Sequence, residues 1–486
     1  MSEIIPIVQK SRKSEKNTYK WDKLLHECEK RDATFLSVDA VRNSLLENFD
    51  ELVENGVAFE FKNRDFDEHL EGGLEARWFA KIIKACGYRV LAEFVGTDDR
   101  FWVHMLSKEV HYFGYTSETV PKNENSFYMV PKSIALDNEE DIDTFVQNTI
   151  NESLIGKPCL SSTFKKEVDQ ISVQKFRPGQ RLELLSYNNS QEIRVARVQE
   201  VCGRRMNVLV DQKDYPRELE EPDDDRQAGN PDAQFWIDQG SFFIFPVGFA
   251  AVNDYTLIAK KDYVEHTSKI ARAISKGEEP PYHENDITFE MLAREPIDAE
   301  KWSKLEVGQK FELLDPLSQQ FKDLHVASIL SFCQTNGYLI IGMDGPQAME
   351  ESFPIHVDNV CMFPVGYAEK YGLTLAPPDN FKGDFNWEEY LRKENAVAMP
   401  LEMFRPWPEQ ERMNKFEVGM HLEAADMCEN QLICPATIKS IHGRLINVNF
   451  DGWDEEYDEL YDIDSHDILP VGWCEFYGYK LQKPKT

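Results

Sequence analysis

Apolar and polar residues alternate along short segments of this chain, and the same kinds of segment return four times in the same order. Each series opens with a glycine followed by an apolar-Glu-apolar pattern. The openings are GVAFEF from Gly56, GQRLELL from Gly179, GQKFELLD from Gly308 and GMHLEAAD from Gly419. Alternation with a period of two is typical of a half-buried β-strand. The pattern therefore predicts four related units that begin with a strand.

Two further alternating segments and a closing motif follow each opening. In the fourth unit these are ICPATIKSI, LINVNF and LPVGW, and the other units have counterparts such as WFAKIIKA, RVLAEF and FPVGY. The closing motifs end at Tyr115, Phe249, Tyr367 and Trp473. Because an aromatic residue recurs at this position, we expect it to belong to the barrel core. Four short strands with Gly and Asp turns predict a small antiparallel barrel in each unit.

A more helical segment precedes each barrel. It is clearest in DFNWEEYLRKENAVAMPLEMF (384–404), where Trp387, Tyr390 and Leu391 have helical spacing. The segment YKWDKLLHECEKRDATFL near the N-terminus has a similar pattern. We expect each unit to consist of an extended or helical arm and a barrel, with the arm packing on a neighbouring barrel.

These patterns divide the chain of 486 residues into four units. A polar, basic N-terminal segment precedes them, and an acidic segment that we interpret as a mobile loop insertion interrupts the second barrel. The expected ranges are a flexible lead-in over 1–18, units over 19–135, 136–262, 263–380 and 381–486, and the insertion over 217–234.

Charge and cysteine content narrow the classes of function. The net charge of −32 argues against a protein that binds DNA or RNA mainly by neutralising phosphates. It favours cationic partners, or it serves solubility alone. The nine cysteines are dispersed, without a CxxC pair or a Cys/His cluster at zinc spacing, so we expect reduced thiols and no metal. No secretory segment or apolar membrane span is found, which favours a soluble intracellular protein.

The stretch NFDGWDEEYDELY (449–461) places large aromatic rings among carboxylates. Phe450 ends a predicted strand, and Asp451-Gly452 forms a turn. Trp453 and Tyr457 are four residues apart and share one face if the segment forms a helical turn. The three rings can therefore converge on one mouth.

The arm FNWEEYL, the opening GMHLEAAD, the turn FDGWDEEYD and the close LPVGWCEFYG resemble the MBT (malignant brain tumour) repeat. The resemblance covers nearly the whole chain. Four such repeats in tandem resemble in particular the four-MBT chromatin proteins of the Polycomb-related group. It implies a mainly β fold with four Tudor/SH3-like barrels. It also implies a nuclear chromatin protein that binds methylated lysines on core histone N-terminal tails, contributes to transcriptional repression, and has neither catalysis nor a cofactor.

The resemblance implies that Phe450, Trp453 and Tyr457 are the walls of an aromatic cage and that Asp426 is its acid. A methylated lysine keeps its charge but presents apolar methyl groups, and aromatic faces attract both. A carboxylate can also pair with the ammonium proton that mono- and dimethyl-lysine retain. Glu429 stands where the family often has Asn, so Glu429 and Cys428 are candidates for the pocket rim.

The acids that flank these rings are expected to form a solvated rim that speeds the approach of basic tails. They are Asp454, Glu455, Glu456, Asp458 and Glu459.

The other three units keep the barrel pattern but lose the cage residues. The third retains Asp315 but has Met343 and Pro346 in place of the first two rings. The second has Ser186 at the acid position and Val210 at the first ring, with Trp236 at a later framework position.

The first unit keeps Phe94 but has Thr97 in place of the central Trp, with no clear acid upstream. The sequence thus predicts one competent pocket in four.

Two other classes of function remain open. In a scaffold, all four barrels would be structural and the acidic surface would dock a repressor complex or unmodified histones. An enzyme is not expected, because no P-loop, HExxH, GxSxG or Rossmann signature is present. Nucleic acid is expected to bind weakly at most, through residues 1–18.

Overall fold

The computed structural model describes most of the chain. The described residues are 2–5, 18–29, 33–42, 44–46, 48–70, 73–119, 125–137, 141–171, 175–186, 189–210, 214, 234–378 and 381–485. Residues 6–17 of the expected lead-in and residues 217–233 of the acidic segment lie outside them, so the predictions of flexibility there are not tested.

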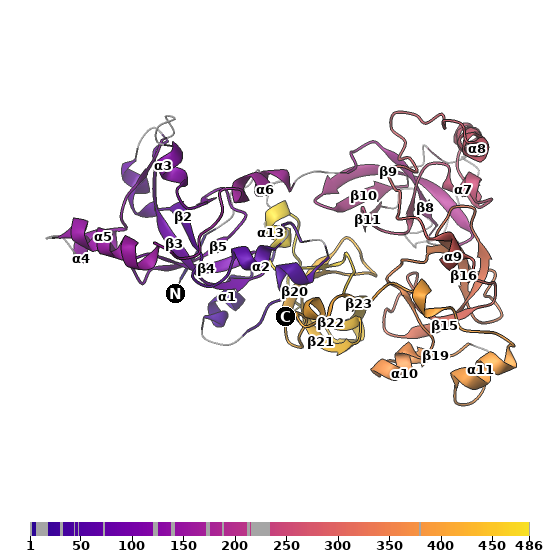
Figure 1. The fold of residues 1–486 in the computed structure, drawn as a ribbon. Coiled ribbons are helices and arrows are strands. Elements are labelled where there is room, and N and C mark those ends of the chain that lie inside the picture. Colours follow the sequence, from indigo (N-terminus) through magenta and orange to yellow (C-terminus); the bar gives the residue numbers. More distant parts are fainter. Residues whose placement is uncertain are drawn as a thin grey trace.

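The chain forms four mainly antiparallel sheets, one for each predicted barrel (Figure 1). Repeat 1 contains β1 (Glu3–Ile4), β2 (Ala58–Lys62), β3 (Glu75–Cys86), β4 (Arg89–Phe94), β5 (Arg100–His104), β6 (Val110–His111) and β7 (Ser126–Tyr128). Repeat 2 contains β8 (Arg181–Leu185), β9 (Glu192–Cys202), β10 (Arg205–Leu209), β11 (Gln234–Asp238), β12 (Ile244–Phe245) and β13 (Thr256–Ile258). Repeat 3 contains β14 (Lys310–Leu314), β15 (Leu324–Phe332), β16 (Tyr338–Met343), β17 (Phe353–His356), β18 (Met362–Phe363) and β19 (Leu375–Ala376). Repeat 4 contains β20 (His421–Ala425), β21 (Ile433–His442), β22 (Leu445–Phe450), β23 (Glu459–Asp462) and β24 (Ile468–Leu469).

The helices are short, apart from α5 and α8. They are α1 (Asp22–Cys28), α2 (Phe49–Leu52), α3 (Tyr115–Thr119), α4 (Lys132–Asp137), α5 (Ile142–Ser153), α6 (Phe164–Gln170), α7 (Phe249–Val252), α8 (Lys261–Lys276), α9 (Ala299–Trp302), α10 (Tyr367–Tyr371), α11 (Trp387–Lys393), α12 (Gln410–Met413) and α13 (Trp473–Tyr477). The 3-10 turns are η1 (Val38–Ala40), η2 (Arg64–His69), η6 (Leu401–Met403) and η7 (Glu455–Tyr457). None of the described helices combines the length and apolarity needed to cross a bilayer.

All four sheets repeat one plan, so the predicted fold class is confirmed. In repeat 4 the strand order is β23-β22-β21-β20-β24, and the other sheets keep the same central order. A short strand that ends just before each closing motif or at its first residue pairs with the opening strand, as β24 does with β20. A register shift bends β21 between Ile438 and Ser440, and the other repeats have a shift in the same hairpin. Such bulges increase the curl of a sheet.

The opening glycine of each repeat has a positive φ, which other residues rarely adopt. In repeat 4, Gly419 has φ +91° and donates its N–H to Ile438 O at 2.8 Å. Gly56, Gly179 and Gly308 have φ values of +90°, +88° and +87° and make the same bond to their own long strand. The sharp turn at this glycine therefore sets where each barrel begins.

A buried glutamate joins the opening strand to the closing motif in every repeat. In repeat 4, Glu423 accepts the backbone N–H groups of Gly472 and Cys474, each at 2.8 Å. Glu60, Glu183 and Glu312 accept the corresponding pairs at 2.7 to 3.0 Å. Burial raises the pKa of Glu183 to about 7 and also raises the pKa of Glu312 and Glu423.

The segment that follows each of the first three barrels returns to that barrel and supplies an aromatic donor to its glutamate. Tyr128 bonds Glu60 at 2.6 Å, Tyr263 bonds Glu183 at 3.4 Å and Trp387 bonds Glu312 at 2.8 Å. The short strands β7, β13 and β19, which close repeats 1, 2 and 3, pair in parallel with the long strands β3, β9 and β15. The arms continue this contact, because Cys159, Asp286 and Ala398 pair with Ala58, Arg181 and Lys310 of the preceding barrels. The prediction that arms pack on neighbouring barrels is confirmed.

The first arm lies on the fourth barrel. Trp21 Nε1 donates to the Glu423 carboxylate at 3.0 Å. Leu36 N donates to His421 O at 2.9 Å, and His421 N donates back to Thr34 O at 3.0 Å. Trp21 and Glu423 are 402 residues apart in sequence. Distant segments of the chain therefore complete one barrel.

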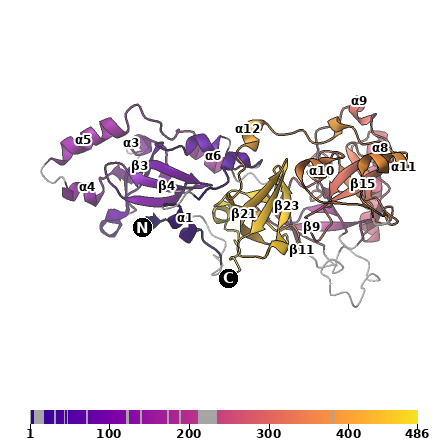
Figure 2. The same cartoon turned by 90° about the horizontal axis from the view of Figure 1, so that it is seen from below.

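Repeat 4 contacts the other three repeats and lies between them (Figures 1 and 2). Tyr88 N of repeat 1 donates to Val471 O at 2.8 Å. Arg205 of repeat 2 pairs with Asp467 at 2.9 Å. Leu460 N donates to Phe321 O of repeat 3 at 2.7 Å. Repeat 4 thus holds the other three repeats together.

The closing aromatics occupy different surroundings from those expected. Trp473, Tyr367 and Phe249 are buried, whereas Tyr115 is partly exposed. Phe249 packs on Tyr338 of repeat 3, with ring centroids 5.1 Å apart. The Tyr367 hydroxyl donates to His442 O of repeat 4 at 2.8 Å. These rings therefore fill the interfaces between barrels and not only the barrel interiors.

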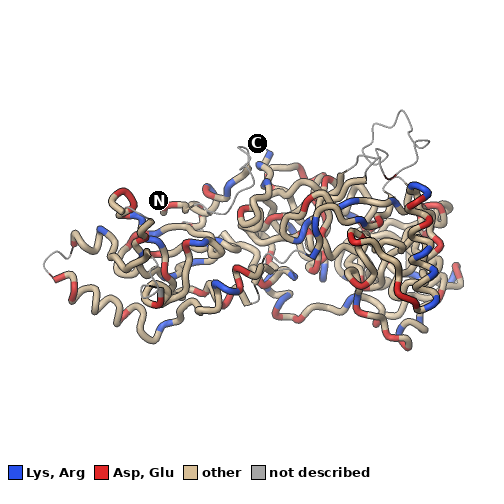
Figure 3. Tube along the Cα trace, turned by 90° about the horizontal axis from the view of Figure 1, so that it is seen from above, with Lys and Arg blue, Asp and Glu red and all other residues tan. Residues whose placement is uncertain are grey.

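Acidic and basic side chains are spread over all four repeats (Figure 3). All nine cysteines are free in the structure.

Replacing Trp21 by Phe tests the contact that attaches the first arm to repeat 4. The loss of one donor to a buried carboxylate is expected to lower the free energy of unfolding by about 1–2 kcal/mol. Urea denaturation measures this change. Trp407→Phe is the control, because Trp407 is 46% exposed. Equal effects of both substitutions would contradict this role of Trp21.

Candidate functional site

The rings of the expected cage lie at one end of the repeat 4 sheet. β22 ends at Phe450, and Asp451 and Gly452 turn the chain toward η7. Trp453 N donates to Phe450 O at 2.9 Å, which closes the turn. Gly452 has φ +80°, and Tyr457 ends η7. The turn and the short helix together bring residues 450–457 back over the sheet.

Trp453 and Tyr457 form an accessible pair of rings. Their centroids are 5.3 Å apart and their planes are inclined by 74°. Tyr457 is 44% exposed, and Trp453 is half-buried with one side packed on the repeat 4 core. An edge-to-face arrangement is a favourable contact between two rings, and the exposed part of Tyr457 is accessible to a ligand.

Phe450 lies deeper than the other two rings. It is 3% exposed and packs in the same apolar cluster as Ile446, Val448 and Tyr461. The structure therefore brings Trp453 and Tyr457 together at the surface, with Phe450 in the core beneath that end of the sheet. Phe450 can contribute the floor of a pocket but not an open wall.

A lysine of the chain itself lies over the ring pair. Lys485 Nζ is 4.8 Å from the centroid of the Trp453 ring and 6.0 Å from that of Tyr457. The backbone of Lys485 crosses the turn so closely that a Cβ on Gly452 would lie 2.3 Å from Lys485 O. Only a glycine at position 452 therefore allows this approach. The ring pair holds a primary ammonium group at cation–π distance.

Asp426 follows β20, and its carboxylate orders its own loop. One oxygen, Oδ1, accepts the N–H groups of Cys428 at 2.9 Å and Glu429 at 2.7 Å. The neighbouring Met427 packs on the same core cluster as Phe450 and Trp453. The loop and the rings thus share one apolar base. Cys428 and Glu429 are exposed, and the Cys428 thiol donates to Gln319 O of repeat 3 at 3.2 Å.

A second carboxylate, Glu459, lies beside Asp426. A ligand atom of each of Asp426, Cys428 and Glu459 lies within 4.8 Å of the others. Glu459 is 4% exposed and accepts Met427 N at 3.0 Å. Burial, and then the charge of Asp426, raise the pKa of Glu459 to about 7.

The position of Glu459 corrects the expectation that all flanking acids form a solvated rim. Asp454, Glu455 and Glu456 are exposed as expected. Asp458 and Glu459 are buried, because β23 begins here and pairs Glu459 with Val448. Asp458 accepts Asn449 Nδ2 at 2.6 Å and Lys439 Nζ at 3.0 Å. Residues 458–462 read DELYD and do not alternate strictly between apolar and polar, so the sequence carried no clear signal for this strand.

The corresponding positions of repeats 2 and 3 are used for packing. Asp315 of repeat 3 is buried and accepts Leu317 N at 2.9 Å. At the turn after β16, Met343 is partly buried and packs against the core of repeat 3, and Pro346 is exposed. In repeat 2, Ser186 is buried and its hydroxyl bonds to no described residue, while Val210 is buried in the core.

Trp236 lies in β11, opposite Asn207. It packs on Tyr479 of repeat 4, with ring centroids 5.1 Å apart. This framework position therefore contributes to the contact between repeats 2 and 4.

Glu60 and Glu423 occupy equivalent positions in their opening strands. Three residues later, repeat 1 has Asn63 and repeat 4 has Asp426. The Asn63 amide donates to Met129 O at 2.9 Å. Phe94 packs on Phe101, with centroids 4.7 Å apart. Thr97 donates to Phe94 O at 3.1 Å. Among the described residues, an accessible Trp-Tyr pair at the turn after the second long strand is found in repeat 4.

Comparisons with known proteins agree with this repeated architecture. The family model described as "mbt repeat" matches residues 180–264, 309–382 and 420–486. Protein lin-61 of Caenorhabditis elegans is 56% identical over 488 residues, which cover 100% of this chain and 80% of that protein. Polycomb protein Sfmbt of Drosophila melanogaster is 30% identical over 88% of this chain and 33% of its own length.

A solved structure gives the same result for the fold. The crystal structure of the four MBT repeats of Drosophila melanogaster Sfmbt, in complex with the peptide RHR(me)KVLR, superposes with a TM-score of 0.77. The match covers 97% of this chain and 99% of the Sfmbt chain at 26% identity. The chain therefore belongs to the family of MBT repeat proteins.

Proposed function

We propose that this protein is a non-enzymatic reader of methylated lysine that binds histone tails through the cage of repeat 4. The cage comprises Trp453 and Tyr457 as open rings, Phe450 as the floor and Asp426 as the acid, with Glu459 beside it. The single observation that carries the proposal is the Lys485 ammonium over the Trp453 and Tyr457 rings. It supports the view that this ring pair accepts a lysine side chain.

Methylation would strengthen such a contact for a physical reason. An unmodified ammonium group is strongly hydrated and gives up hydrogen bonds to water when it enters an aromatic site. Methyl groups replace those hydrogen bonds and make apolar contact with the rings, while the charge remains. A carboxylate such as Asp426 or Glu459 can pair with the proton that mono- and dimethyl-lysine retain.

The affinity of one such pocket is modest. Cation–π contacts of about 0.5–2 kcal/mol per ring and a charge-assisted bond of about 1.5–3 kcal/mol are opposed by the ordering of the peptide. We expect dissociation constants in the micromolar to millimolar range. Stable recruitment to chromatin would therefore need further contacts through partner proteins.

The family relationship supports the cellular part of the proposal. Sfmbt carries the name Polycomb protein, and its four repeats were solved with a peptide that contains methylated lysine. We infer a nuclear protein that contributes to transcriptional repression without catalysis of its own.

An interaction scaffold is the second candidate. The observation that favours it is the retention of the barrel, glutamate and arm in repeats 1, 2 and 3, although the cage residues are replaced there. In this function the barrels would dock a repressor complex or unmodified histones, and methylation would not change the affinity.

Substitution of the cage separates the two candidates. Trp453→Ala and Asp426→Ala are each expected to weaken binding of methylated histone peptides about tenfold, because each removes a contact to the cation. Fluorescence anisotropy with unmodified, mono-, di- and trimethylated peptides measures this. Pro346→Ala and Asp315→Ala, at the equivalent positions of repeat 3, are the matched controls. If methylated and unmodified peptides bind alike and no substitution matters, the scaffold is correct.

Removal of Lys485 is expected to increase the affinity for methylated peptides. The side chain competes for the Trp453 and Tyr457 rings, and an exposed cation–π contact is worth about 0.5–1 kcal/mol, so Lys485→Ala should tighten binding about two- to fivefold. The same peptide titration gives the result. Lys483→Ala is the control, because Lys483 is exposed and close in sequence. An unchanged affinity for Lys485→Ala would show that the contact does not compete.

The raised pKa of Glu459 predicts a pH dependence of binding. As the pH rises from about 6 to about 8, Glu459 passes its pKa of about 7 and becomes ionised. The second negative charge beside Asp426 favours a cation, so the affinity for dimethyl-lysine peptide should rise about two- to fivefold. Glu459→Gln should flatten this profile in anisotropy titrations, while Glu456→Gln should not. A rise that persists in Glu459→Gln would assign it to another group.

A further inference from the structure

A large cavity lies at the junction of repeats 1, 2 and 4, away from the cage. Its volume is about 660 Å³. Repeat 1 contributes the loop between β5 and β6, the arm that follows contributes α6, repeat 2 contributes the turn between β9 and β10, and repeat 4 contributes α13. The volume lies in the range of sites that hold a drug-sized ligand or a short peptide segment.

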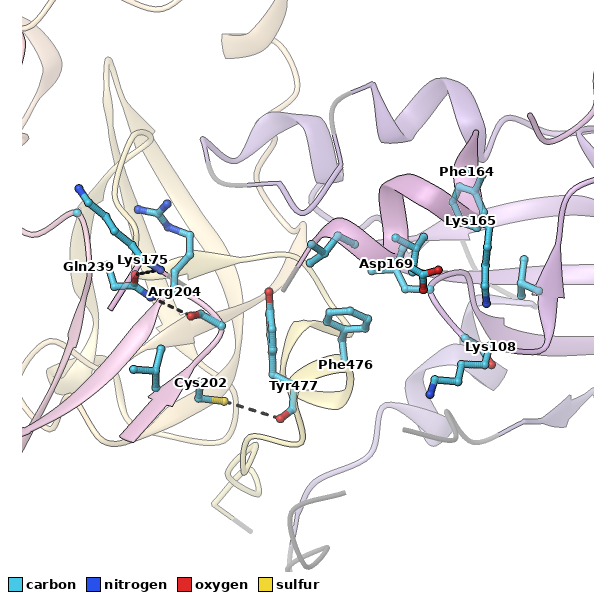
Figure 4. Close-up of a pocket in the computed structure, with 18 of the residues that line it drawn as sticks. Lys108, Phe164, Lys165, Asp169, Lys175, Cys202, Arg204, Gln239, Phe476 and Tyr477 are labelled. Atoms are coloured by element: carbon cyan, nitrogen blue, oxygen red, sulfur yellow. Dashed lines mark hydrogen bonds between the residues drawn. The ribbon is translucent and has the colours of Figure 1, made fainter. Parts of the chain in front are cut away.

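The cavity has a charge opposite to that of the whole chain. The chain has 86 acidic and 54 basic residues. The charged residues that line the cavity are Lys108, Lys165, Lys175, Arg204, Arg294 and the single acid Asp169. Figure 4 shows Lys108 and Lys165 on one side of the cavity and Lys175 and Arg204 on the other. We call this set of residues the basic groove.

Contacts within the protein leave much of this positive charge unpaired. Arg204 pairs with Asp238 at 2.9 Å. Arg294 donates to the neutral carbonyl groups of Gly240 and Ser241, at 3.0 and 2.6 Å. Lys108, Lys165 and Lys175 form no ion pair with any described residue.

The mutual repulsion of these cations acts on Lys175. Its pKa is lowered, first by partial burial and then by the charges of Arg294 and Arg204. Among the described residues, five cations line the groove with one acid, Asp169, and Asp238 pairs with Arg204. The excess of positive charge would favour an external anion.

The floor of the basic groove is apolar. Phe476 and Tyr477 of α13 lie between its two basic sides in Figure 4, and Phe164 and Val168 of α6 also line it. An inorganic ion would use the cations but leave this floor uncovered. A ligand that fits both features has carboxylates near its ends and apolar side chains between them.

We propose that the basic groove binds an acidic peptide segment of a partner protein, with aspartate or glutamate flanking apolar residues. A nucleic acid strand also offers anions and apolar rings. However, its dense phosphates would be repelled by the net charge of −32, whereas a few carboxylates are affected less. Because repeats 1, 2 and 4 all contribute, the groove exists only in the assembled chain. The proposal is independent of methyl-lysine reading.

Selection from a library of random octapeptides tests the proposal on the full chain. We expect the bound pool to be enriched in Asp and Glu, and the selected peptide to bind about tenfold or more weakly to the Lys165→Glu/Lys175→Glu variant, because each reversal replaces an attraction by a repulsion. The control Lys269→Glu/Lys276→Glu makes the same change of net charge on exposed positions of α8 and should bind like the wild type. Binding should also weaken at high salt.

Three results would overturn the proposal. They are a bound pool without enrichment of acidic peptides, equal binding by the groove variant and the wild type, or tighter groove-dependent binding of a single-stranded or duplex oligonucleotide than of any selected peptide. Circular dichroism melting shows whether each variant is folded. If the reversal lowers the melting temperature, Lys108→Gln/Lys165→Gln removes two of the unpaired charges and serves instead.

Discussion

The buried glutamate of each opening strand is the contact on which the rest of the fold depends. Moving a carboxylate out of water is costly, by several kcal/mol even after relaxation. Two backbone N–H groups at the end of the barrel and one aromatic donor from another segment offset this cost in every repeat. One side chain thus joins the start of a barrel, its end and the segment that packs on it. If any of the three is displaced, a buried charge is left with fewer partners.

The same contact explains the long-range organisation. In the first three barrels each glutamate takes its aromatic donor from the segment that follows the barrel. In the fourth barrel, Trp21 of the first arm supplies the donor to Glu423. This closure brings the N-terminal arm onto repeat 4 and places repeat 4 in contact with all the others. The cage and one wall of the basic groove are therefore carried by the most connected repeat.

Structural and binding residues are separable within a repeat. Repeats 1, 2 and 3 keep the glutamate and the opening glycine but not the cage. At the turn of repeat 3, Asp344 bonds Tyr390 at 2.7 Å and also contacts Lys310, so the turn is tied to its arm. In repeat 4 the equivalent Asp451 accepts Thr437 Oγ1 at 2.8 Å, and the residues beyond it are free to carry Trp453 and Tyr457. Loss of the rings therefore does not require loss of the barrel.

The two proposed sites differ in the charge of the ligand that they would bind. The proposed cage combines rings with Asp426 and with Glu459, and burial raises the pKa of Glu459 to about 7. The basic groove has the opposite sign in a chain whose net charge is −32. A cationic tail and an acidic segment would thus be directed to different parts of one molecule.

The sequence by itself determined the four units, their strands, the positions of the opening glycines and the pairing of Trp453 with Tyr457. These features depend on local periodicity and on backbone conformations that one residue type favours, so they can be read along the chain. Only the tertiary structure decided that the first arm lies on the fourth barrel, that Glu459 is buried beside Asp426, that Phe450 is buried in the core, and that Lys485 lies over the rings. Each of these depends on contacts between distant segments, and alternation within one segment does not specify its partner.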